Sequence, residues 1–256
     1  MLLRQAFALS LVSLLALSAC ERKKPAEAPQ PSAQAGRVTA PALAVQAFKV
    51  ELQADSQCRE RCAEFKAEWL HFPQQPGLDA ALLMVAEAPA GMAAQEAIQR
   101  LGKSFLADAV EAREGWQQLL AAEVDAGLND VSVIDVESYS YTGGAHGMTT
   151  ATYVNWDRRL NRVLKLADVI LPGHEPAFWS EAQRAHQAWV RGHDDAASLG
   201  AGWPFGKTDN FALKPDVLVL KYQPYAIGPY SEGTPEIRLD YARLAGVLRP
   251  EYLPGR

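Results

Sequence analysis

The first 20 residues constrain the fold most, because they have the pattern of a segment that is removed before the rest of the chain folds. Arg4 supplies a positive charge, residues 6–17 form an apolar run broken only by two serines, and small residues lead up to Cys20. This order is typical of a secretory signal. The run is shorter than the roughly 20 apolar residues that a membrane-spanning helix needs. We therefore expect residues 1–19 to be cleaved and the mature chain to fold outside the cytoplasm.

The cleavage region ends in Leu17-Ser18-Ala19-Cys20, which resembles the lipobox of bacterial lipoproteins. In such proteins the cysteine thiol is acylated and becomes the new N-terminus, and several acyl chains together anchor a protein stably. The sequence thus predicts a lipoprotein of the cell envelope that is held to the membrane through Cys20 and faces the periplasm. It gives no physical basis for choosing the inner or the outer membrane. The alternative is an ordinary signal peptide that happens to be followed by a cysteine.

The stretch that follows the signal is expected to be a flexible tether. Residues 20–44 contain four prolines among Ala, Gln, Glu and Ser and lack apolar periodicity, so they cannot bury enough surface to offset their ordering entropy. Removal of residues 1–19 leaves 237 residues (256 − 19), with a net charge of about −6 because the −5 of the whole chain includes Arg4. This mild acidity argues against nucleic acid as a partner, because nucleic acid requires a basic face.

Two further cysteines, Cys58 and Cys62, restrict the backbone between them. In a straight strand their Cα atoms would lie about 13 Å apart, whereas a disulfide needs about 4.4–6.8 Å. An oxidising compartment favours a disulfide, so we expect the chain to turn here and a disulfide to close the turn. A thiol redox pair and half of a metal site are the alternatives, although redox pairs usually have two intervening residues and a zinc site needs further ligands.

Apolar residues alternate with polar ones in several short segments and recur at helical spacing in others. Alternation predicts strands near residues 48–52, 65–69, 131–141, 149–156, 211–213, 217–222 and 237–241. Helical spacing predicts helices over residues 79–87, 93–113, 175–190 and about 244–248. Residues 116–128 fit either structure, residues 163–169 are expected to continue the sheet, and residues 192–210 are expected to be a loop. This order indicates an α+β fold, with an antiparallel sheet and helices packed on one side of it.

Motifs of catalysis are scarce. The sequence has no Gly-x-Ser-x-Gly elbow and no His-Glu-x-x-His pair. Residues 101–104 look like the end of a phosphate loop, but Ala97 stands where that loop needs a glycine. A metal site at His186 and His193 is conceivable, and a helix end with a favourable dipole is the more ordinary explanation. The sequence therefore predicts no metal, no cofactor and no catalytic residue.

The candidate ligand-binding residues are aromatic and lie in glycine- and proline-rich loops. Glycines bracket His146, which could face a ligand or act as a general base, or could only hydrogen-bond the backbone of its own loop. Aromatic loops offer rigid contact area, as binding surfaces do, but loops that cap a core look the same. The candidates are His146, Trp203, Phe205, Tyr222, Tyr225 and Tyr230.

Seven tracts in the second half of the chain form a recognisable set. They are Tyr141–Gly147, Asn155 with Asp157, Leu164–Val169, Asn210–Leu213, Tyr222–Tyr230, Gly233 and Glu236–Leu239. Together they resemble the RsiV-like ectodomain family, whose domain also accompanies a polysaccharide deacetylase domain in proteins similar to PdaC. The resemblance implies an α+β domain over residues 129–253, preceded by a companion region over residues 45–128.

The resemblance also implies a binding function, because RsiV senses lysozyme by binding it. We expect this chain to bind a lysozyme-like protein or peptidoglycan, and its acidity suits a cationic partner because complementary charge speeds encounter. We expect neither sigma-factor regulation nor deacetylation, because the chain offers no segment before the lipobox for a sigma factor and no deacetylase domain. The alternatives are a cell-wall hydrolase that uses His146 as its base and a purely structural envelope protein.

Overall fold

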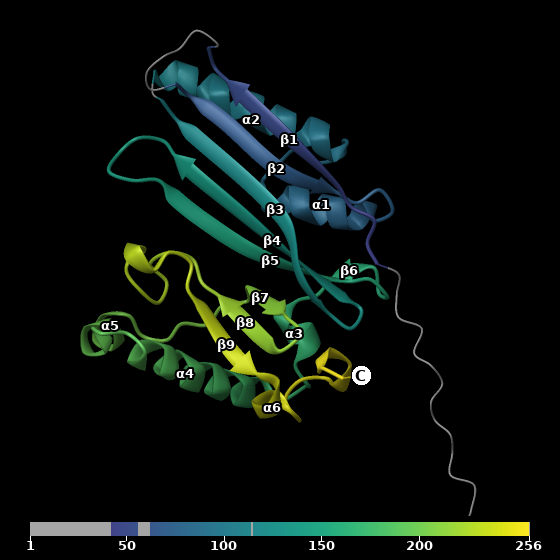
Figure 1. The fold of residues 1–256 in the computed structure, drawn as a ribbon, viewed down its shortest axis with the longest axis vertical. Coiled ribbons are helices and arrows are strands. Elements are labelled where there is room, and N and C mark those ends of the chain that lie inside the picture. The colour runs from purple at the N-terminus through teal and green to yellow at the C-terminus, as the bar shows by residue number, and fades with distance from the viewer. Residues whose placement is uncertain (1–41, 56–61, 114, 256) are drawn as a thin grey trace, which may run out of the picture. The chain divides into compact units, whose positions relative to one another are not determined.

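The computed structural model describes residues 42–55, 62–113 and 115–255. These residues belong to one compact unit, Thr39–Arg256, which contains two β-sheets and several helices (Figure 1). The larger sheet has the strand order β1-β2-β3-β4-β5-β6, and the smaller one has the order β7-β8-β9. The α+β fold class expected from the sequence is confirmed.

The larger sheet is mixed rather than purely antiparallel. Its strands are β1 (Gln46–Gln53), β2 (Glu64–His71), β3 (Gln117–Leu128), β4 (Val131–Tyr141), β5 (Met148–Asp157) and β6 (Arg162–Val163). Neighbouring strands are antiparallel except β2 and β3, which are parallel. A parallel pair requires a crossover connection, and α1 (Pro76–Val85) with α2 (Ala94–Ala112) provides it. The expectation of an antiparallel sheet is therefore wrong at this one pairing.

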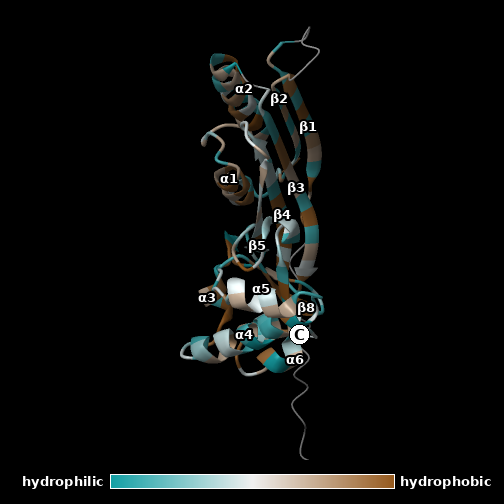
Figure 2. Ribbon diagram, turned by 90° about the vertical axis from the view of Figure 1, so that its left-hand side faces the viewer, coloured by the Kyte–Doolittle hydropathy of each residue, from teal (hydrophilic) through white to brown (hydrophobic). Residues whose placement is uncertain are grey.

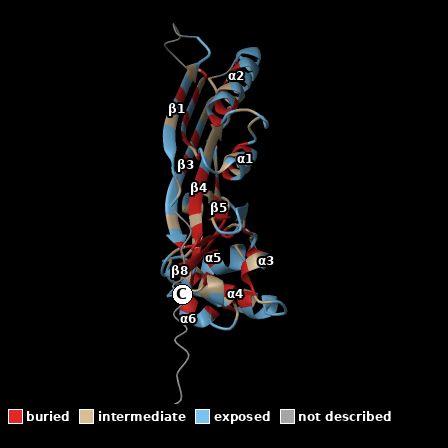
Figure 3. Cartoon of the chain, turned by 90° about the vertical axis from the view of Figure 1, so that its right-hand side faces the viewer, coloured by how far each residue is buried: buried red, intermediate tan, exposed pale blue. Residues whose placement is uncertain are grey.

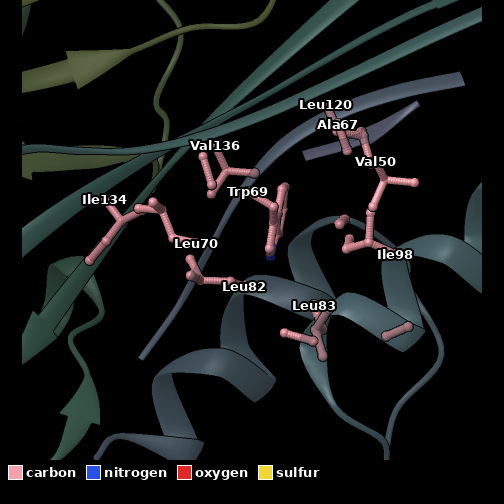
Figure 4. Packing of buried hydrophobic residues seen from close by; sticks show 14 of the residues in the cluster. Val50, Ala67, Trp69, Leu70, Leu82, Leu83, Ile98, Leu120, Ile134 and Val136 are labelled. Atoms are coloured by element: carbon pink, nitrogen blue, oxygen red, sulfur yellow. The ribbon is translucent and has the colours of Figure 1, made fainter. Parts of the chain in front are cut away.

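Helices α1 and α2 cover one face of the larger sheet (Figure 2). Alternate residues of β2 make this possible, because Phe65, Ala67 and Trp69 are buried while the intervening charged residues are exposed. Figure 4 shows Trp69 between the strands and the helices, in one cluster with Leu82, Leu83 and Ile98. The helix-free face is exposed along β1 and β3 (Figure 3).

The smaller sheet lies between β5 and helix α4 (Figure 1). Its strands are β7 (Phe211–Leu213), β8 (Val217–Lys221) and β9 (Glu236–Asp240), and α4 spans Glu175–Arg191. Every residue of β7 and β8 is buried, because one face of the sheet packs on the larger sheet and the other packs on α4. A second core forms there, separate from the core beneath α1 and α2.

Several local predictions need correction. Residues 163–169 do not continue the sheet beyond β6, because the chain enters the short helix α3 (Leu166–Val169). The segment expected to be a loop over residues 192–210 contains helix α5 (Ala196–Gly202), and the last α-helix, α6, spans Tyr241–Leu244 instead of residues 244–248. Two short 3-10 turns, Tyr230–Glu232 and Pro250–Tyr252, complete the fold.

The expected division between residues 128 and 129 falls in the β3–β4 hairpin, so the two expected regions share the larger sheet. The expected signal peptide, Cys20 and most of the tether lie outside the described residues, as does Cys58. The Cys58–Cys62 disulfide therefore stays a prediction. Among the described residues, none of the helices is both long enough and apolar enough to cross a membrane.

Candidate functional site

The turn between β4 and β5 holds His146 in place, and glycines make its shape possible. Gly143 and Gly144 have φ values of 100° and 94°, in a region that residues with a side chain rarely adopt. At Gly147 a Cβ atom would lie 2.4 Å from Cζ of Tyr139, so only glycine fits without displacing that ring. The Tyr141 hydroxyl also donates a hydrogen bond to the carbonyl of Gly144, at 3.1 Å. The turn is thus fixed by the sequence around it.

The imidazole of His146 is exposed and has three neighbours within the site. Its Nδ1 lies 2.8 Å from the carbonyl oxygen of Gly147, so Nδ1 carries the proton and donates, because a carbonyl can only accept. Its Nε2 lies 3.4 Å from the hydroxyl of Tyr225. The ring stacks on Tyr230, with the centroids 4.1 Å apart and 25° between the planes.

Three separate segments bring four rings together, which we call the aromatic cluster: His146, Trp203, Tyr225 and Tyr230. The ring of Tyr225 lies 5.8 Å from that of Tyr230 and 6.3 Å from that of Trp203. The Tyr230 hydroxyl donates to the carbonyl of Gly147 at 2.9 Å, which joins the β8–β9 loop to the β4–β5 turn. Four of the six residues predicted to contact a ligand therefore lie side by side.

Tyr225 is the most exposed tyrosine of the cluster and has a strained backbone. The residue is 44% exposed to solvent, and its backbone φ angle is 66°. A left-handed conformation costs a residue with a large side chain about 1–2 kcal/mol. Such strain persists where the surrounding structure enforces it, and it is often found at binding sites. The conformation presents the ring of Tyr225 to solvent.

The other two candidates lie outside the aromatic cluster. Tyr222 is only 2% exposed, and its hydroxyl donates to the carbonyl of Gly206 at 2.8 Å. It follows directly after the buried strand β8, which explains its place in the core. Phe205 packs against α4 instead, where its ring centroid lies 5.6 Å from that of His186 and 6.4 Å from that of Trp179.

A buried ionic network, which was not predicted from the sequence, lies between the two sheets. The side chain of Lys221 is 5% exposed, and its Nζ lies 2.7 Å from Oδ2 of Asp135 and 3.5 Å from Oε1 of Glu137. The same Nζ lies 4.6 Å above the ring of Tyr153, whose hydroxyl donates to Glu236 at 2.6 Å. Burial raises the pKa of the Asp135 carboxyl, although the ion pair with Lys221 opposes this. The sequence offered two signals of this network: Lys221 ends an otherwise apolar strand, and Asp135 lies within another strand.

Three side-chain amides join the smaller sheet to β5. Asn155 donates to the carbonyl of Phe211 at 2.6 Å and accepts from the N–H of Leu213 at 3.0 Å. The side-chain amides of Asn210 and Gln223 likewise donate to carbonyls and accept from N–H groups of the β5 backbone, with donor–acceptor distances of 2.7–3.1 Å. All three residues belong to the tracts that carry the RsiV-like resemblance. Their contacts here are structural, and they hold the loops that carry the aromatic cluster.

The contact at Nδ1 of His146 is made by a backbone group. A catalytic histidine is normally oriented by a carboxylate at Nδ1, but here a backbone carbonyl occupies that position. Within the part of the chain that the structure describes, His146 has no hydrogen bond to a carboxylate. The same residues contain no group of three or more His, Cys, Asp or Glu side chains that could hold a metal ion.

Comparison with known proteins gave matches to one family model and to solved structures. The family model is described as "Protein of unknown function (DUF3298)" and matches residues 167–242. The crystal structure of a DUF3298 family protein from Pseudomonas aeruginosa PAO1 is 36% identical, covers 84% of this chain and 99% of that chain, and has a TM-score of 0.73. A DUF3298 family member from Bacteroides fragilis NCTC 9343 is 20% identical over 83% of this chain and 96% of that chain, with a TM-score of 0.67. None of the curated proteins matched.

Proposed function

The chain belongs to the DUF3298 family of proteins of unknown function, and from this premise we propose that it is an envelope lipoprotein that binds a lysozyme-like protein through its aromatic cluster. The observation that carries the proposal is the convergence of His146, Trp203, Tyr225 and Tyr230 from three segments. Tyrosine and tryptophan dominate the energetic centres of protein interfaces. The rings of His146 and Tyr230 are stacked, and both are hydrogen-bonded to the carbonyl of Gly147, before any ligand arrives, which lowers the ordering cost of binding.

The turn that carries His146 packs against Tyr139 of β4. The buried Gly147 leaves no room for a Cβ beside the ring of Tyr139, and its carbonyl accepts a hydrogen bond from the Tyr230 hydroxyl. Tyr139 in turn lines a hollow of about 370 Å³ on the helix-free face of the larger sheet, together with Leu119 and Thr149.

The identity of the ligand is supported by the resemblance and by charge. The tracts that resemble RsiV include the turn with His146 and the loop with Tyr225 and Tyr230. The chain carries a formal net charge of −5, which favours encounter with a basic protein. Peptidoglycan is the competing ligand, because aromatic rings can also pack on sugars.

Two immobilised ligands distinguish these possibilities. The unit Thr39–Arg256 would be incubated with beads that carry a c-type lysozyme and, separately, with insoluble peptidoglycan. Retention on lysozyme beads that is lost in Tyr225→Asn, but not in Met84→Gln, supports the proposal; Met84 is an exposed apolar residue on α1, 74% accessible. Retention on peptidoglycan alone would replace the proposed ligand, and retention on neither would reject it.

The lipoprotein part of the proposal has its own test. The full chain and its Cys20→Ser variant would be expressed in a Gram-negative host, and membrane and soluble envelope fractions would be compared. Acyl chains on Cys20 are expected to hold the wild type in the membrane fraction, whereas the variant should be depleted from that fraction. Equal distribution of both proteins would contradict lipidation and leave the binding proposal unaffected.

A further inference from the structure

A second surface gathers arginines on a chain that is acidic overall. A hollow of about 350 Å³ lies between α4, β9 and α6. Its lining includes Arg184, Arg191, Arg238 and Arg243, with Glu181 and Asp240 as the only acids in it. The formal charge of the lining is therefore +2 (4 − 2), against −5 for the whole chain. We call this hollow the arginine pocket, and it shares no residue with the aromatic cluster.

A buried carboxylate fixes two of the four guanidinium groups. Glu181 is 7% exposed, and its two oxygens lie 2.5 Å from Nη1 of Arg184 and 3.5 Å from Nη1 of Arg243. A guanidinium has five N–H donors, so each of these arginines keeps donors for a further acceptor. Glu181 is itself neutralised by the two arginines, and it positions them at one side of the pocket.

The other two arginines are not held by an ion pair of this kind. Arg191 and Arg238 are both exposed and come from different elements, α4 and β9. Among the described residues, neither forms an ion pair. Like charges that gather around one hollow repel one another. An anion that bound there would relieve this repulsion and could accept hydrogen bonds from several guanidinium groups at once. The pocket therefore has the charge and the donors of an anion site, and a volume in the range of ligand pockets.

We propose that the arginine pocket binds a phosphate group, either free or in the headgroup of a lipid. Guanidinium groups match phosphate oxygens through paired hydrogen bonds, and arginine is preferred over lysine where such paired recognition matters. Phosphate is favoured over a single carboxylate, because it has more oxygens that can accept hydrogen bonds from several guanidinium groups. The inference stands apart from the proposed function, because it concerns a different surface and a different ligand.

The test uses the unit Thr39–Arg256, whose two cores are complete within it and whose Pseudomonas relative aligns with 84% of the chain. Calorimetry with inorganic pyrophosphate measures free phosphate binding. Co-sedimentation with vesicles of phosphatidylglycerol and phosphatidylcholine, against phosphatidylcholine alone, measures headgroup binding. We expect saturable binding of pyrophosphate, and Arg191→Gln and Arg238→Gln should each weaken it about tenfold, the loss expected for one charged hydrogen-bond pair.

The matched control is Arg100→Gln, which removes the same charge from an exposed arginine of α2 and should leave binding unchanged. Thermal denaturation confirms that all three variants remain folded. Vesicle binding that depends on Arg191 and Arg238 would assign the site to a lipid headgroup, and pyrophosphate binding without vesicle binding would assign it to a free phosphate. No saturable binding of either probe, or an equal loss in Arg100→Gln, would overturn the proposal.

Discussion

The imidazole of His146 stacks on the ring of Tyr230, with 4.1 Å between the centroids and 25° between the planes. His146 belongs to the β4–β5 turn of the larger sheet, whereas Tyr230 belongs to the loop between β8 and β9 of the smaller sheet. The stack therefore depends on how the two sheets pack, and it forms as part of folding. Such preorganisation would lower the ordering cost of the binding that we propose for this surface.

Replacing Tyr225 should separate binding from stability. Asparagine tolerates the left-handed conformation that Tyr225 adopts at φ 66°, so Tyr225→Asn should fold with a melting temperature within about 2–3 °C of the wild type, as expected for a surface change. The variant lacks an exposed ring of the aromatic cluster, so its affinity for a lysozyme-like ligand should fall about tenfold or more. Thermal denaturation and binding would be measured on the same preparation. Unchanged affinity in a folded variant would exclude Tyr225 from the interface.

Asn155 should be essential for attaching the smaller sheet. Asn155→Ala leaves a buried carbonyl of Phe211 and a buried N–H of Leu213 without partners, and each such loss costs about 1–3 kcal/mol. We expect the free energy of unfolding to fall by about 2–4 kcal/mol, measured by urea denaturation. Gln187→Ala removes an exposed amide from α4 and should change stability by less than about 0.5 kcal/mol. If both variants were equally stable, the amide contacts would not hold the sheets together.

Lys221 and Asp135 should be energetically coupled. Lys221→Met leaves the buried Asp135 carboxylate without its nearest cation, and breaking a buried ion pair from one side costs about 3–5 kcal/mol. Adding Asp135→Asn should recover part of this loss, because it removes the unpaired charge. A double-mutant cycle by urea denaturation measures the coupling. Strictly additive effects of the two changes would show that the ion pair contributes nothing to stability.

Two histidines near the end of α4 should give opposite dependences of stability on pH. Burial lowers the pKa of His186 below its usual 6.5, so its contribution is present above pH 6.5 and is lost as the pH falls through the lowered value. A hydrogen bond to the Trp189 carbonyl, assisted by Glu232, raises the pKa of His193 above 6.5. Its contribution is therefore complete below pH 6.5 and is lost as the pH rises through the raised value.

Melting temperatures between pH 5 and pH 8 test both signs. His186→Leu should make the protein less sensitive to acid, because no buried imidazole must then become charged. His193→Gln should make it more sensitive to acid, because a contribution that is present at low pH has been removed. If both variants shifted the profile in the same direction, the assignment of these two environments would be wrong.

The sequence predicted the elements of the fold better than their pairing. Alternation located β4 and β5, and the glycines between them located the turn, because both signals are local. The parallel pairing of β2 with β3 was missed, because it depends on where α1 and α2 return the chain. Helix α5 was also missed, since its short, glycine-containing sequence has little helical pattern of its own.

The candidate site was predicted in part for the same reason. Aromatic loop residues can be recognised along the chain, but whether they meet is decided by packing between distant segments. Tyr225 and Tyr222 are three residues apart in one tract, yet one is exposed and the other completes the core. The network of Lys221 was missed because a charged residue in a buried strand is recognisable only when its partners on another strand are known.

The measurement that tests the central claim most directly is titration of the unit Thr39–Arg256 with a c-type lysozyme by calorimetry, at low and at high salt. We expect saturable binding at one site that weakens as salt rises, since opposite charges attract the two proteins, and that is lost in Tyr225→Asn but retained in Met84→Gln. An absence of binding at both salt concentrations, or equal binding by Tyr225→Asn and the wild type, would contradict recognition of lysozyme through the aromatic cluster.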